Sequence, residues 1–245
     1  MEFLPTLSLV LQLALVGSSA ILYRLSGRPP NTSGSQPQPP PTDTPSRERV
    51  DTFVSKWMPL SAYVMRKEYY IATLFEFIFI LESKFPELKV FLRRITPSAD
   101  DATSSLSAIR LMALTIGVAG CALRLWCYDL LGSNFVWQTS APTSLVTVGP
   151  YSIVRHPSYT GLVMTSVGLS AYYLLPGSWI RESGFVATVP GTAAIGFWIV
   201  NWVWVTVFLV VLRIDNEDEV LEKQFGKEWR SWRDRVRSRV IPGIW

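Results

Sequence analysis

The chain contains a single histidine and only two cysteines among its 245 residues. Zinc sites are built mainly from three or four His and Cys ligands, so this sequence cannot assemble one from the usual set. Cys121 and Cys127 lie six residues apart in one apolar stretch. On a helix they face different sides and stand too far apart for a disulfide. We therefore expect no metal centre and no internal disulfide.

Charge is also scarce, because only 17% of the residues are charged while 49% are hydrophobic. Residues 3–23 hold no charge over 21 positions, and residues 190–212 are likewise uncharged. Runs of this length can cross a bilayer as helices. Residues 106–127 are apolar except for Arg110 and Arg124 near the ends, where long side chains can snorkel to the interface.

Two weaker segments complete the pattern. Residues 69–83 are rich in aromatic side chains but include Glu76 and Glu82, and residues 160–175 are apolar but short. With them, the sequence predicts an all-α integral membrane protein with about five transmembrane helices. We expect the first segment to be retained rather than cleaved as a signal peptide, because its N-terminal flank carries Glu2 and no Lys or Arg.

The distribution of Lys and Arg predicts the orientation in the membrane. With five spans, loops 24–68 and 128–155 and the tail 213–245 share one side and hold 16 Lys and Arg, against 5 in the loops of the other side. The positive-inside rule then places the tail in the cytosol. The net charge of +4 fits a membrane surface better than a nucleic-acid partner, because the basic residues accompany no nucleic-acid-binding motif.

Seven prolines fall within residues 29–45, which contain almost no large apolar side chains. This composition is typical of an extended spacer. The predicted organisation is a first transmembrane helix in 1–28, a Pro-rich cytosolic linker in 29–65, two transmembrane helices in 66–127, and a functional core in 128–245 with the last two spans and a helical tail.

The only histidine, His156, lies in a polar loop between two apolar stretches, in the sequence Gly149-Pro150-Tyr151-Ser152-Ile153-Val154-Arg155-His156-Pro157-Ser158-Tyr159. Pro157 disfavours helical geometry at His156 and suits the first turn of a new helix. A helix that starts there directs free backbone N–H groups toward an anion. His156 either meets the carboxylate of a small zwitterion or makes a structural hydrogen bond, and the sequence leaves both interpretations open.

After the last apolar run, Arg213 and Glu217 are four residues apart and share one face of a helix. This spacing fits either a surface ion pair or a pair of functional charges. From Val220 to Val240, apolar residues then recur at helical spacings among five arginines. We expect this amphipathic tail either to lie on an anionic leaflet or to pack on the rest of the protein.

Residues of the C-terminal half form an ordered set, namely Gly132-Ser133-Asn134-Phe135, Gln138, Leu145-Val146-Thr147, Gly149-x-Tyr151, Arg155-His156-Pro157-Ser158-Tyr159-x-Gly161, Arg213-x-x-x-Glu217 and Phe225-Gly226-x-Glu228-Trp229. The set resembles the isoprenylcysteine carboxyl methyltransferases over residues 128–245. The Arg-His-Pro-x-Tyr motif alone also occurs in phospholipid methyltransferases and sterol reductases, whereas the full set is more specific.

The resemblance implies an integral membrane enzyme of the endoplasmic reticulum. It would transfer the methyl group of S-adenosyl-L-methionine to the C-terminal carboxylate of a prenylated cysteine, on a protein or a small molecule. Arg213 would bind the substrate and act with Glu217 in catalysis. The cofactor would be held by Gln138, Thr143, Ser144, Leu145, Val146, Tyr151, His156, Pro157, Ser158, Tyr159 and Glu217.

The scarcity of catalytic bases agrees with such a reaction. An α-carboxyl group has a pKa of about 3.5, so it is already ionised at neutral pH and needs no general base. The enzyme must instead align the carboxylate with the methyl group. Arg213 suits this task because a guanidinium can hold a carboxylate through two hydrogen bonds.

Three alternatives use the same residues differently. A phospholipid N-methyltransferase accepts an amine, which must lose a proton, and has less need of a carboxylate-binding arginine. A sterol-reductase-like protein would use NADPH, but such chains have more spans than 245 residues can hold. A catalytically inactive membrane scaffold would not bind S-adenosyl-L-methionine.

Overall fold

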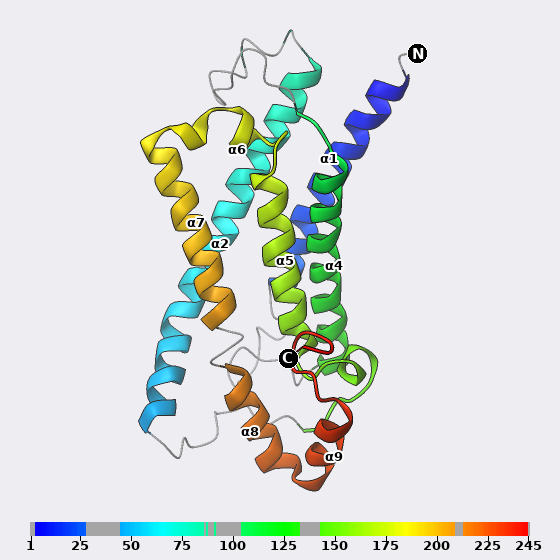
Figure 1. The fold of residues 1–245 in the computed structure, drawn as a ribbon, viewed down its shortest axis with the longest axis vertical. Coiled ribbons are helices and arrows are strands. Elements are labelled where there is room, and N and C mark those ends of the chain that lie inside the picture. The colour runs from blue at the N-terminus through cyan, green and yellow to red at the C-terminus, as the bar shows by residue number, and fades with distance from the viewer. Residues whose placement is uncertain are drawn as a thin grey trace. The chain divides into compact units, whose positions relative to one another are not determined.

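The computed structural model describes residues 3–27, 45–85, 87, 91, 104–132, 143–208 and 213–244, and these residues form helices and loops without a strand (Figure 1). The helices are α1 (Phe3–Ser26), α2 (Pro45–Lys84), α4 (Ala108–Leu131), α5 (Pro157–Leu174), α6 (Trp179–Glu182), α7 (Val189–Phe208), α8 (Ile214–Phe225) and α9 (Lys227–Arg235). Two short 3-10 turns are η2 (Gly149–Ser152) and η3 (Phe185–Ala187). The predicted all-α class is confirmed for the described part of the chain.

Each of the five predicted apolar segments overlaps a helix, namely α1, α2, α4, α5 and α7. Two stretches, Leu9–Ser26 and Ala108–Leu131, are long and apolar enough to cross a membrane by length and composition. They agree with a membrane protein. The five spans and the cytosolic orientation of the tail stay predictions.

Helix α2 begins earlier than the sequence analysis predicted. It starts at Pro45, so residues 45–65, which were assigned to the linker, are helical. Proline is favoured in the first turn of a helix because its missing N–H needs no partner there. No glycine interrupts the sequence from that proline to Lys84, and the helix continues through Pro59, although a proline inside a helix lacks the N–H of one backbone hydrogen bond. The remainder of the predicted linker, 29–44, lies outside the described residues.

The chain divides into two compact units, and each draws on three stretches of sequence. The first unit contains residues 1–24, 64–119 and 165–202, and the second contains residues 25–63, 120–164 and 203–245. Every predicted site residue that the structure describes belongs to the second unit.

The first unit is organised around a buried ion pair between α2 and α4. Glu76 and Arg110 are 2.5 Å apart, and each side chain is 1% exposed. The other carboxylate oxygen of Glu76 accepts a hydrogen bond from the backbone N–H of Trp179 at 2.8 Å. Arg110 also donates to the backbone oxygens of Gly177 and Tyr172, at 2.7 and 3.3 Å. These contacts compensate the desolvation of both charges and tie α2 and α4 to the turn before α6.

Helices α4 and α5 approach each other closely at glycines. In the first unit, a Cβ atom at Gly168 would lie 2.3 Å from the backbone nitrogen of Gly117. In the second unit, a Cβ atom at Gly161 would lie 2.7 Å from the backbone oxygen of Gly120. Small residues permit such backbone contact between apolar helices. Within the second unit, this contact holds the first turns of α5 against α4.

We expect Glu76→Leu to destabilise the first unit strongly, because it leaves the Arg110 guanidinium buried without its anion. Breaking a buried ion pair by removing one partner costs roughly 3–5 kcal/mol. The double variant Glu76→Leu/Arg110→Met buries no charge and should recover much of that loss. Thermal unfolding of the detergent-purified protein, followed by tryptophan fluorescence, measures both effects. A double variant less stable than Glu76→Leu would contradict this account.

Candidate functional site

The loop that contains His156 is bounded by a tight turn and a helix start. Turn η2 begins at Gly149, whose φ of 61° lies in the left-handed region that favours glycine. Helix α5 begins at Pro157, as the sequence predicts. The fixed φ and missing N–H of proline suit this first position. Helix α8, which supplies the facing side chains, begins directly after Arg213.

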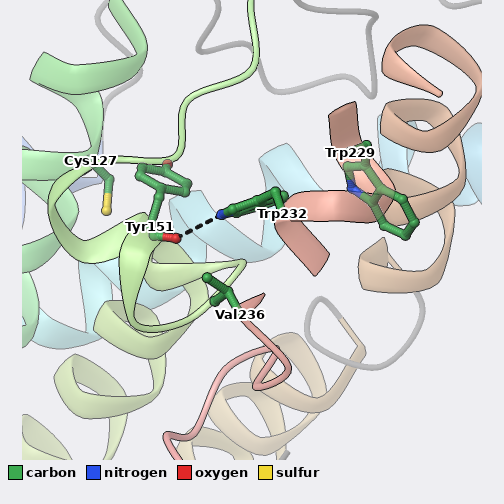
Figure 2. Close-up of a cluster of buried hydrophobic side chains, with 5 residues drawn as sticks. All are labelled: Cys127, Tyr151, Trp229, Trp232 and Val236. Atoms are coloured by element: carbon green, nitrogen blue, oxygen red, sulfur yellow. Dashed lines mark hydrogen bonds between the residues drawn. The ribbon is translucent and has the colours of Figure 1, made fainter. Parts of the chain in front are cut away.

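A hydrophobic cluster fixes this loop to the C-terminal tail, and it consists of the buried residues Cys127, Tyr151, Trp229, Trp232 and Val236. Figure 2 shows the indole nitrogen of Trp232 directed at the backbone oxygen of Tyr151, and this hydrogen bond is 3.1 Å long. Leu145 and Val146, both predicted cofactor residues, pack against the same cluster. Of the two arrangements considered for the amphipathic tail, the structure therefore has it packed on the protein through its aromatic face.

The tail beyond α9 also binds the loop through its backbone. Arg155 and His156 donate their backbone N–H groups to the carbonyl oxygens of Ser238 and Arg239, at 3.0 and 2.8 Å. The hydroxyl of Thr160 donates to the next carbonyl oxygen along the tail, at 2.6 Å. Three consecutive carbonyl groups of the tail thus fix the end of the loop and the first turn of α5.

The His156 side chain is buried, and both of its ring nitrogens face carboxylates of α8. Nε2 lies 2.9 Å from Oδ1 of Asp218, and Nδ1 lies 3.4 Å from Oε2 of Glu217. Because these two carboxylates are consecutive on a helix, they point about 100° apart and can face one imidazole ring from two sides. This geometry fits an imidazolium, which donates from both nitrogens.

Glu217 connects the histidine to Arg213 and Tyr159. Its Oε1 accepts a hydrogen bond from the Tyr159 hydroxyl at 2.6 Å and lies 3.3 Å from Nη2 of Arg213. Only 9% of the Arg213 side chain and 24% of the Glu217 side chain are exposed. The predicted i,i+4 pair is therefore part of a buried network and is not an isolated surface ion pair.

Asp218 extends the network to the loop and the tail. Its Oδ2 lies 3.0 Å from Nη1 of Arg155 and 3.6 Å from Nε of Arg239. Arg239 also contacts the exposed carboxylate of Asp215 at 2.8 Å. We use the name charge cluster for Arg155, His156, Tyr159, Arg213, Glu217, Asp218 and Arg239.

The contacts in the charge cluster shift pKa values in opposite directions. Burial lowers the pKa of His156, but hydrogen bonds to Asp218 and Glu217 outweigh burial and raise the pKa above its usual value. Burial raises the pKa of Glu217, but the contacts with His156, Arg213 and Tyr159 outweigh it and lower the pKa. The stability that the His156–Glu217 pair contributes is therefore lost as pH rises through the raised pKa of His156. It is also lost as pH falls through the lowered pKa of Glu217.

The predicted site residues are only partly brought together. His156, Tyr159, Glu217 and Arg213 meet in the charge cluster. Pro157 and Ser158 form the first turn of α5 beside it.

The other predicted cofactor residues are not members of the charge cluster, although Tyr151 lies close enough to Glu217 and Tyr159 to interact with them electrostatically. Tyr151 is 7% exposed, with its ring in the hydrophobic cluster. Thr143 and Ser144 are exposed. Gln138 lies outside the described residues. The roles assigned to all these residues stay predictions.

Asp218 and Arg239 of the charge cluster, and the contact of Arg124 with the first turn of α5, were not predicted from the sequence. Asp218 follows Glu217 directly, and this pair of acidic residues at the start of α8 was the available signal. Arg239 is one of many arginines in the tail, and no spacing relates it to the loop. Arg124, predicted as a snorkelling residue, instead donates to the backbone oxygen of Ser158 at 3.1 Å and is 9% exposed.

We expect the tail to be required for the structure of the loop. A chain that ends after Arg235 loses Val236 from the hydrophobic cluster and the three carbonyl groups that bind the loop. It should unfold at a clearly lower temperature than the full chain, because buried donors left without acceptors cost about 1–3 kcal/mol each. A chain that ends after Ile241 keeps every one of these contacts and is the matched control. Equal melting temperatures for the two truncations would contradict the role of the tail.

Comparison with known proteins identifies relatives of this region. The family model described as the isoprenylcysteine carboxyl methyltransferase (ICMT) family matches residues 112–223. The protein-S-isoprenylcysteine O-methyltransferase of Dictyostelium discoideum is 31% identical over 131 residues, which are 52% of this chain and 46% of that protein. Protein-S-isoprenylcysteine O-methyltransferase B of Arabidopsis thaliana is 33% identical over 96 residues, 39% of each chain.

A Delta(14)-sterol reductase of Gibberella zeae is also similar, with 27% identity over 121 residues, or 44% of this chain and 25% of that protein. The chain thus spans about a quarter of the sterol reductase and less than half of either methyltransferase. The matched residues 112–223 include His156, Arg213, Glu217 and Asp218 of the charge cluster. The resemblance predicted from the sequence is confirmed, because residues 112–223 of this chain are similar to the isoprenylcysteine carboxyl methyltransferase family.

Proposed function

We propose that this protein methylates the C-terminal carboxylate of prenylated cysteines, with S-adenosyl-L-methionine as the methyl donor. The observation that carries the proposal is the convergence of Arg213 and Glu217 with His156 and Tyr159 inside the residues that match the family. The His156–Tyr159 pair and the Arg213–Glu217 pair are far apart in sequence, and the resemblance assigns their members to the cofactor and the substrate.

The chemistry of these side chains fits a zwitterionic cofactor. S-adenosyl-L-methionine carries a cationic amino group and a carboxylate, and when bound it supplies an electrophilic methyl group on a sulfonium. Glu217 can accept hydrogen bonds from a cationic group, and its 24% exposure makes it more accessible than His156, at 6%. His156 supplies positive charge beside it. The exposed hydroxyls of Thr143 and Ser144 and the side chains of Leu145 and Val146 would complete the cofactor site.

Arg213 suits the acceptor carboxylate. Its guanidinium has five N–H donors in a planar fork and lies 3.3 Å from Glu217. A group of this shape can hold a carboxylate in a fixed plane through two parallel hydrogen bonds. Holding the two reactants in line converts a bimolecular step into an effectively unimolecular one, which is where this enzyme would gain most of its rate.

The proposed setting is the endoplasmic reticulum membrane, with the charge cluster and the tail on the cytosolic side. The excess of Lys and Arg in the loops that carry the site supports this orientation. A lipid-modified acceptor would reach the site from the membrane. The exposed apolar side chains of α4, among them Ile109, Met112 and Trp126, suit contact with lipid.

A second candidate is a sterol reductase, which the similarity to the Delta(14)-sterol reductases favours. The two functions differ in their co-substrates, because a reductase requires a hydride donor and a methyltransferase does not. Incubation with each co-substrate therefore separates them.

We expect membranes that contain the full chain to transfer labelled methyl groups from S-adenosyl-L-methionine to N-acetyl-farnesylcysteine. The label should be released as methanol in base, because the product is a methyl ester. Base-stable label on phosphatidylethanolamine would instead indicate a phospholipid N-methyltransferase. NADPH-dependent reduction of a sterol Δ14 double bond, without methyl transfer, would indicate a reductase. Absence of all three reactions and of S-adenosyl-L-methionine binding would indicate a scaffold and contradict the proposal.

Variants of the Arg213–Glu217 pair test the proposed site. Arg213→Lys keeps the charge but loses the planar fork, so it should lose most activity and raise the KM for the prenylcysteine. Glu217→Gln should raise the KM for S-adenosyl-L-methionine by about tenfold or more, since hydrogen bonds to charged groups contribute about 1.5–3 kcal/mol.

The matched control is Glu219→Gln, which removes the exposed i,i+4 partner of Lys223 on the same helix. It should leave both KM values unchanged, since exposed pairs contribute at most about 1 kcal/mol. Near-wild-type turnover by Arg213→Lys and Glu217→Gln in membranes with equal protein would remove these residues from the site.

A further inference from the structure

The imidazole of His156 is enclosed by anions in a way that determines its protonation state. Nε2 and Nδ1 lie 2.9 and 3.4 Å from oxygens of Asp218 and Glu217. A neutral imidazole carries one N–H and one lone pair, so one carboxylate would face a lone pair. Only the imidazolium donates toward both carboxylates. The geometry therefore favours a cation at this position.

Asp218 is the more firmly held of the two anions. Its side chain is 8% exposed, and both of its oxygens face cations. Oδ1 faces His156, while Oδ2 faces Arg155 of the loop at 3.0 Å and Arg239 of the tail at 3.6 Å. Two arginines from different segments thus contact the carboxylate that faces Nε2 of the ring. Glu217, by contrast, is 24% exposed and lies where a ligand can reach it.

We propose that Asp218 is a positioning residue, which keeps His156 doubly protonated and oriented with its Nδ1–H toward Glu217. The inference rests on the proposed function, because Glu217 and His156 are the residues proposed to hold the cofactor. Asp218 does not need to touch the cofactor for this role. Asp218 acts on Glu217 indirectly. It sets the orientation and the positive charge of the His156 ring, and the Nδ1–H of that ring faces Glu217.

The other groups that face His156 fit this assignment. From α5, the ring of Tyr159 lies 6.0 Å from the imidazole, between ring centroids, and its hydroxyl donates to Glu217. Arg213, directly before α8, also contacts Glu217. Arg155 of the loop and Arg239 of the tail contact Asp218, so they weaken the electrostatic attraction between Asp218 and the imidazolium. Removing the Asp218 carboxylate would leave three cations close together, namely Arg155, Arg239 and the imidazolium. Of these, only histidine can lose its proton near neutral pH.

The single histidine permits a direct test. Protein labelled with ¹⁵N-histidine and purified without a polyhistidine tag gives one imidazole, so its NMR titration in detergent reports His156 alone. We expect both nitrogens to be protonated at pH 7.5 and the pKa to lie above the usual value of about 6.5. Asp218→Asn preserves the shape of the side chain but removes its charge. It should lower the pKa of His156 by one unit or more, whereas Asp218→Glu should restore it at least in part.

Glu219→Gln is the matched control, because it removes a charge from the next residue of the same helix, where the side chain faces Lys223. It should leave the titration of His156 unchanged. A neutral His156 at pH 7.5 in the unsubstituted protein would overturn the proposal. An unchanged pKa in a folded Asp218→Asn variant would overturn it as well.

Activity gives a second and separate readout. In Asp218→Asn, the alkaline limb of the pH profile of kcat/KM for S-adenosyl-L-methionine should move to lower pH. The shift should equal the decrease in the pKa of His156 measured by NMR, and the KM should change more than kcat. A purely structural role would lower the amount of folded enzyme without moving the limb. If the NMR result holds while no variant or unsubstituted protein methylates prenylcysteine, the proposed function fails and the positioning of His156 stands.

Discussion

The structure of the second unit depends on the requirement that each buried charge has an opposite charge or a polar group beside it. Arg155, His156 and Asp218 are each less than 10% exposed, and an isolated ion at such a position would be strongly disfavoured. Each is tolerated because opposite charges or backbone groups surround it. The loop, the start of α8 and the tail must therefore be in place together, since removing any one of them would leave a buried charge without its partner.

The hydrophobic cluster explains how the tail reaches this arrangement. Trp229 and Trp232 of α9 pack with Tyr151, and the Trp232 indole binds the Tyr151 carbonyl group. This packing brings the tail back to the loop, so that the carbonyl groups of Ser238 and Arg239 reach the N–H groups beside His156. Apolar packing thus provides the positional accuracy that the charges require, and the charges in turn determine which rotamers the packed segments present to a ligand.

Local features of the site could be predicted from the sequence, and long-range ones could not. Pro157 specified the start of α5, and the four-residue spacing of Arg213 and Glu217 specified their contact, because both follow from helix geometry. The contact between His156 and Asp218 spans 62 residues and depends on how α8 packs. The start of α2 at Pro45 was missed because the linker inferred from the Pro-rich residues 29–45 was extended to residue 65.

The charge cluster is better suited to alignment than to proton transfer. An efficient general acid or base has a pKa near the working pH. Here burial raises the pKa of Tyr159, while the contacts with His156, Arg213 and Tyr159 lower that of Glu217. The protons of His156 are directed at two carboxylates, so the ring is a poor donor to a third group. A reaction whose nucleophile is already ionised loses nothing by this arrangement, whereas an amine acceptor would need a base to remove its proton. This difference favours a carboxylate over an amine as the acceptor.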